Sequence, residues 1–69
     1  MFTLEAVANV HREYEHGNVS SFTFGMRNGK RYTWRASTSK WYDAEGRCYA
    51  DSTGVRLSRL ARQWYAAQD

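Results

Sequence analysis

Residues 22–34, FTFGMRNGKRYTW, place an Asn-Gly pair between two segments in which apolar and polar side chains alternate. Asn-Gly between such segments is a strong short-range signal for a β-hairpin. A two-residue loop at residues 28–29 would put apolar side chains on both faces of the hairpin. A three-residue loop at residues 27–29, with Gly29 in the left-handed conformation, gathers them on one face. We therefore predict this longer loop, with a buried face made of Phe22, Phe24, Met26, Tyr32 and Trp34.

Residues 40–50, KWYDAEGRCYA, predict a second hairpin. Asp43 suits the first position of a type I turn, and Gly46 suits the left-handed position that closes the turn. Both faces of this hairpin carry an aromatic side chain, so the sequence leaves open which face is buried. The predicted pairs are Asp43 with Arg47, Tyr42 with Cys48, and Trp41 with Tyr49.

Two further segments flank the hairpins. Residues 54–67 predict an amphipathic helix, capped by Ser52 or Thr53, with Asp51 near its positive end. Residues 4–16 fit either a helix or a strand, and their alanine and glutamate content favours the helix. The apolar stripe of the C-terminal helix is Leu57, Leu60, Ala61 and Trp64.

These elements predict one small α+β domain over residues 1–69. Its antiparallel sheet has three to four strands from the two hairpins, and the C-terminal helix packs on one face. An N-terminal helix or an additional strand completes it. An antiparallel sheet covered on one side leaves its other face to solvent.

The composition excludes several classes of protein. A single cysteine rules out an intrachain disulfide framework and a four-cysteine zinc site. No segment approaches the roughly 20 apolar residues that a membrane-spanning helix needs. Residues 1–10, MFTLEAVANV, lack the charged-then-apolar layout of a signal peptide. We therefore expect a cytoplasmic protein without membrane association.

Positive charge is concentrated in one part of the chain. The formal net charge is +3, and eight of the ten basic residues are arginine. Five of the ten fall within residues 26–40, where the chain has no acid. Arginine and lysine contact nucleic-acid phosphates, and exposed aromatic rings stack on bases. The candidate binding residues are Arg27, Lys30, Arg31, Arg35, Lys40, Trp41, Tyr42, Arg59 and Arg62.

No pair of reactive side chains has the spacing that catalysis or metal binding requires. His11 and His16 differ by five positions, about 140° around a helix, and a strand would point them to opposite faces. No sequence pattern fixes the distance of either histidine from Cys48 or Asp51. We therefore expect a protein that is not an enzyme and uses no metal or cofactor.

The leading hypothesis is a small basic protein that contacts nucleic-acid phosphates through an arginine-rich sheet face. The alternative is a phage- or mobile-element-type modulator that inhibits a host enzyme or defence complex. Its arginines and aromatic residues would then face an acidic protein partner. The sequence leaves open whether the partner is DNA, RNA or protein, and whether the chain is a monomer or a homodimer.

Overall fold

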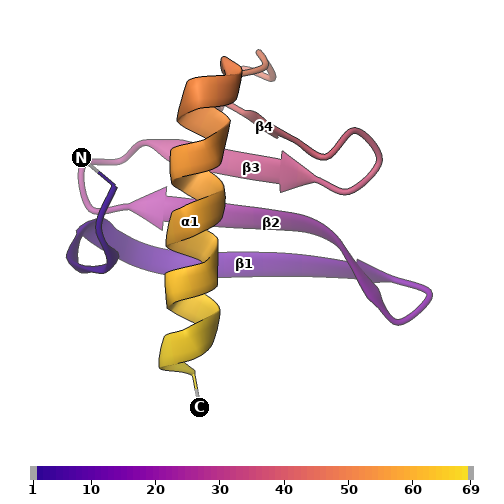
Figure 1. The fold of residues 1–69 in the computed structure, drawn as a ribbon, viewed down its shortest axis with the longest axis horizontal. Coiled ribbons are helices and arrows are strands. Elements are labelled where there is room, and N and C mark those ends of the chain that lie inside the picture. Colours follow the sequence, from indigo (N-terminus) through magenta and orange to yellow (C-terminus); the bar gives the residue numbers. More distant parts are fainter. Residues whose placement is uncertain (1, 69) are drawn as a thin grey trace.

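A four-stranded antiparallel sheet carries one helix across one of its faces in the computed structural model, which describes residues 2–68 (Figure 1). The strands lie in the order β1-β2-β3-β4, so each strand is hydrogen-bonded to the one that precedes it. This is the predicted α+β architecture. The elements are the 3-10 helix η1 (Leu4–Ala6), β1 (Val7–Glu15), β2 (Asn18–Met26), β3 (Arg31–Arg35), β4 (Lys40–Tyr42) and α1 (Asp51–Ala67).

The β2–β3 hairpin has the predicted three-residue loop. Gly29 has a φ of +90°, and the Asn28 side-chain oxygen accepts the Lys30 N–H at 3.0 Å. The predicted apolar face lies under α1, with four of its five side chains buried and Trp34 half-buried. The observed pairs are Phe22 with Trp34, Phe24 with Tyr32, and the Met26 N–H with the Lys30 carbonyl at 2.9 Å.

The second hairpin is also confirmed, and the structure settles which of its faces is buried. Tyr42 bridges to Cys48, and Gly46 has the left-handed backbone, with a φ of +87°. Trp41 is only 4% exposed and faces α1. Because side chains alternate along a strand, Tyr42 lies on the opposite face.

Residues 4–16 form η1 and β1, so the favoured prediction of an α-helix was wrong and the strand alternative is correct. β1 pairs with β2 from Val7, opposite Met26, to the end of the strand. The turn residues His16 and Gly17 both have positive φ, +53° and +83°, as a two-residue type I′ turn requires. Intrinsic helix propensities differ by only a few tenths of a kcal/mol per residue, so pairing and burial against β2 outweigh them.

A β-bulge explains why apolar residues do not alternate regularly along β1. The register against β2 shifts at Ala8. This shift allows Val7 and Val10 to face α1 although they are three residues apart. Arg12 lies on the same side, where its guanidinium carbon is 5.1 Å from the centre of the Trp64 ring. The aromatic ring therefore accommodates a charged residue on the apolar side of the strand.

Aromatic and leucine side chains fill the space between the sheet and α1. Phe24 and Leu57 are fully buried, and Leu60 is 1% exposed. The Trp41 ring stacks on Phe24, with 5.8 Å between centroids and 7° between planes. Its Nε1 also donates a hydrogen bond of 3.1 Å to Ser58 Oγ. Trp41 therefore connects β4 to both β2 and α1.

The predicted apolar stripe of α1 is confirmed, but the start of the helix was predicted wrongly. Ala50 occupies the N-cap position, and Ser52 and Thr53 lie inside the first turn. The chain is still held against β4 just before this point, because the Tyr49 N–H donates to the Trp41 carbonyl at 2.9 Å. The helix begins as soon as that contact ends. Asp51 lies in the first turn, near the positive end of the helix, as predicted.

We predict opposite effects of two glycine-to-alanine substitutions on the free energy of unfolding. Gly29→Ala lowers it by about 1–2 kcal/mol, because an L side chain is strained at a positive φ. Gly54→Ala raises it by about 0.5–1 kcal/mol, because alanine is the better helix former and the added Cβ would make an ordinary 3.7 Å contact with Trp41. Urea unfolding followed by tryptophan fluorescence measures both, and a stabilised Gly29→Ala protein would contradict the three-residue loop.

Candidate functional site

The face of the sheet opposite α1, which we call the open face, is built from alternate residues of all four strands. On β2 and β3 these residues are the neighbours of the buried aromatic side chains, as the hairpin register requires. The open face comprises Asn9, His11 and Glu13 on β1, Ser21, Thr23 and Gly25 on β2, Arg31, Thr33 and Arg35 on β3, and Lys40 and Tyr42 on β4.

Small side chains make the middle of the open face concave. Thr23 and Thr33 share a hydrogen bond of 3.1 Å between their hydroxyl oxygens, and Gly25 has no side chain. Two adjoining hollows, of about 690 and 440 Å³, share His11, Thr23, Thr33 and Arg35 in their walls. A ligand on this face would therefore meet hydroxyl groups on the floor and an arginine where the two hollows adjoin.

Arg31 and Arg35 project from β3 onto the open face. Because a strand rises about 3.3 Å per residue, their backbone positions are about 13 Å apart. The Arg35 guanidinium carbon lies 5.4 Å from the centre of the Tyr42 ring, whose hydroxyl shares a 2.8 Å hydrogen bond with Thr38. This contact positions Arg35. Within residues 2–68, neither arginine takes part in an ion pair, so both charges are available to a ligand.

Folding also brings an acid onto the open face. Glu13 lies in the row of residues that continues through Ser21 to Arg35. Its carboxylate accepts a 3.3 Å hydrogen bond from the Ser21 hydroxyl and lies 3.6 Å from His11 Nε2. The sequence prediction missed that Glu13 lies near Arg35, because it favoured a helix for residues 4–16. The strand alternative was the signal that could have placed Glu13 on the sheet. The open face therefore carries a carboxylate on β1 and basic side chains on β3 and β4.

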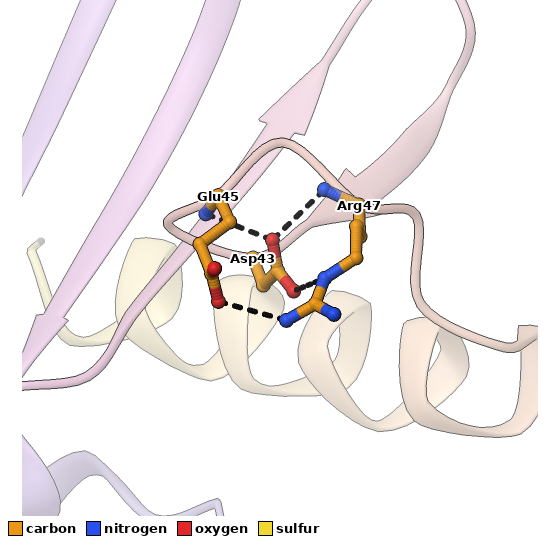
Figure 2. A network of polar contacts seen from close by, with 3 residues as sticks. All are labelled: Asp43, Glu45 and Arg47. Atoms are coloured by element: carbon orange, nitrogen blue, oxygen red, sulfur yellow. Dashed lines mark hydrogen bonds and ion pairs between the residues drawn. The ribbon is translucent and has the colours of Figure 1, made fainter.

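Asp43 organises the turn at the edge of the smaller hollow (Figure 2). Its carboxylate accepts the backbone N–H groups of Arg47 and Glu45 at 2.8 and 2.9 Å, and the Arg47 Nε–H at 3.2 Å. The backbone hydrogen bond from Arg47 is the main cause that lowers the pKa of Asp43 below its ordinary value. Arg47 also contacts Glu45, at 2.7 Å. The negative charge of Asp43 is therefore largely satisfied inside the turn.

Four of the other candidate residues lie away from the open face. The Arg27 Nε–H donates to the Glu5 carbonyl at 2.7 Å, which holds this side chain against η1. Lys30 is exposed at the tip of the β2–β3 hairpin. Arg59 and Arg62 are exposed on α1, in the other layer of the molecule. One flat ligand on the open face therefore does not reach the arginines of the helix.

The prediction that Trp41 could stack on a base was wrong. Its ring is enclosed between Phe24 and α1, because burying the indole there stabilises the fold more than exposing it on the open face would. Tyr49 also faces the core, with its ring centre 5.5 Å from that of Tyr32. Tyr42 is the aromatic residue that the second hairpin contributes to the open face.

The reactive side chains are dispersed over the surface. Within residues 2–68, no three His, Cys, Asp or Glu side chains lie close enough together to hold a metal ion. Cys48 is an exposed free thiol, and His11 lies exposed on the open face. In the same part of the chain, no helix is both long and apolar enough to span a membrane.

Comparisons of the chain with protein-family models, curated proteins and solved structures found no match. The functional proposal therefore depends on the geometry and charge of the surfaces. Among them, the open face combines a concave floor, exposed arginines and hydroxyl groups.

We predict that the pKa of Asp43 stays below its ordinary value of 3.8 when Arg47 is replaced by alanine. The backbone N–H groups remain in that variant, and they include the largest cause of the shift. Because the folded-state pKa is the lower one, the carboxylate stabilises the fold above its ordinary, unfolded-state pKa. This stabilisation is lost as the pH falls through the folded-state pKa. An NMR titration of the side-chain carboxyl carbon tests this, and a fully restored pKa in Arg47→Ala would assign the shift to the guanidinium instead.

Proposed function

We propose that the protein is a non-enzymatic nucleic-acid-binding protein that contacts duplex phosphates through its open face. The observation that carries this proposal is the pair Arg31 and Arg35, which project from the same face of β3 without acidic partners among residues 2–68. Guanidinium groups hold phosphates by two parallel hydrogen bonds. Thr33 lies between the two arginines on β3, its hydroxyl shares a hydrogen bond with that of Thr23 on β2, and threonine hydroxyls also contact phosphates.

The spacing of the two arginines favours a grooved, double-stranded partner. Their backbone positions are about 13 Å apart, and the major groove of B-form DNA is about 12 Å wide. Two side chains at this separation can contact phosphates on both edges of one groove. Thr33, midway between them on the same face, would then lie over the groove itself.

The placement of the aromatic residues argues against single strands as the preferred ligand. Proteins that bind single strands without sequence preference stack successive bases on exposed aromatic rings. Within residues 2–68, the open face has one aromatic residue, Tyr42, and the Arg35 guanidinium lies over its ring. Trp34, Trp41 and Tyr49 belong to the helix side of the sheet. The face therefore offers charge and hydroxyl groups but no stacking platform.

A protein partner is the second candidate, and the mixed charge of the open face favours it. Glu13 on β1 would repel a polyanion, whereas a protein surface can present a base opposite Glu13 and acids opposite Arg31 and Arg35. In this alternative the chain is a phage- or mobile-element-type modulator of a host enzyme or defence complex. We rank it second because neither arginine has an acidic partner among residues 2–68, whereas Glu13 is already engaged by His11 and Ser21.

We predict that Arg31→Ala and Arg35→Ala each weaken binding to a labelled 20-base-pair DNA duplex by about 3- to 10-fold. Each should also reduce the slope of log K against log salt by about one, because one phosphate contact is lost. Arg56→Ala is the matched control, because it removes the same charge from the exposed surface of α1. Fluorescence anisotropy at several salt concentrations measures all four proteins.

Two results would overturn this proposal. One is an equal effect of the three substitutions, which would indicate a response to net charge rather than to the open face. The other is binding weaker than about 100 µM at low salt to duplex DNA, duplex RNA and single strands alike. In that second case, retention of one stoichiometric protein partner from nuclease-treated host lysate, lost in Arg31→Ala, would support the protein-partner alternative.

A further inference from the structure

An apolar hollow of about 330 Å³ lies beside α1, on the face of the sheet opposite the open face. Its walls include Val19 and Trp34 from the sheet and Ala61 and Tyr65 from the helix. The hollow exists because α1 is narrower than the sheet is long: a helix is about 10 Å wide, whereas nine-residue strands such as β2 run about 30 Å. Figure 1 shows β1 and β2 continuing well past the helix toward their connecting turn.

The chemistry of this hollow favours an apolar occupant over water. Most of its wall is aromatic and aliphatic, and the Ser58 hydroxyl is already hydrogen-bonded to Trp41 Nε1 at 3.1 Å. A water molecule needs two to four polar partners to be held in a cavity. Tyr65 at the rim is 42% exposed, so the hollow is also open to the solvent. An apolar side chain from a ligand would therefore gain by entering it.

One end of the hollow opens onto positive charge. A second hollow, of about 350 Å³, shares Trp41 and Ser58 with the first and is lined by Lys40, Arg59 and Arg62. Arg62 is one helical turn from Ser58, so it lies within about 6 Å of the apolar hollow along the helix. Among residues 2–68, Asp51 is the one acid in the walls of the two hollows, and it lies about two turns before Ser58.

We propose that these two hollows form a docking groove for an acidic peptide segment of a partner protein. A leucine, phenylalanine, tryptophan or methionine of that segment enters the apolar hollow. An aspartate or glutamate within one turn of it lies against Arg62 or Arg59. A nucleic-acid base fits less well, because Val19 and Ala61 offer no partner for the polar edge of a base. The groove is on the opposite side of the sheet from the open face, so this proposal is independent of the nucleic-acid proposal.

Selection of a random peptide library displayed on phage, against the full chain, tests the chemistry of the occupant. The expected result is enrichment of peptides with a large apolar residue and at least one acid within four positions of it. Synthetic peptides from the enriched set should shift the NMR signals of the Trp34 indole and the Ala61 methyl group. Absence of enrichment, or enrichment of basic sequences, would overturn the proposal.

Variants of the groove then test its position. Ala61→Leu fills the hollow and should abolish peptide binding, whereas Ala66→Leu makes the same change at an exposed helix position and should not. Arg62→Glu should weaken binding about tenfold or more by charge repulsion, and Arg56→Glu should change it less than about twofold. Circular dichroism confirms that each variant is folded.

Three outcomes would contradict the proposal, two by assigning the groove to another occupant and one by placing the peptide elsewhere. One is self-association of the protein that Ala61→Leu abolishes, measured by sedimentation, because a second copy would then fill the groove. Another is a single-stranded oligonucleotide that competes with the selected peptides. The third is peptide binding that depends on Arg31 rather than Arg62, because this would move the site to the open face.

Discussion

The register of the β2–β3 hairpin determines the chemistry of both faces of the sheet. A shift of β3 by one residue against β2 would turn Tyr32 toward solvent and Arg31 toward the core while Phe24 stayed buried. Burial of one large apolar side chain stabilises the fold by about 1.5–3 kcal/mol, and several such side chains depend on this register. The left-handed Gly29 contributes about as much as a single one of them. The glycine permits the loop, and burial against α1 selects it.

Trp41 joins the short edge strand β4 to the rest of the molecule. β4 has only three residues, too few for its backbone hydrogen bonds alone to hold it firmly. The indole stacked on Phe24 and hydrogen-bonded to Ser58 attaches the strand to the sheet and to the helix at once. With Trp41 turned inward, its neighbour Tyr42 is turned outward beneath Arg35. The same side-chain placement that stabilises the edge of the sheet therefore positions the arginine of the open face.

Local signals in the sequence were sufficient for both predicted hairpins and for the apolar stripe of α1. They failed where the outcome depended on distant partners. The helix propensity of residues 4–16 was overridden by pairing with β2, which no local pattern reveals. The orientation of Trp41 was undetermined, because its hairpin carries an aromatic on each face. Arg31 and Arg35 were placed correctly on one face by alternation, whereas the proximity of Glu13 required the path of β1.

The uneven charge across the open face has a consequence for orientation. Glu13 lies at one side of the sheet, and Arg31, Arg35 and Lys40 lie toward the other. A long polyanion placed across the strands would meet attraction at one end and repulsion at the other, whereas one aligned with β3 would meet cations along its length. The electrostatic field of the sheet would thus orient such a ligand along β3 before any close contact is made.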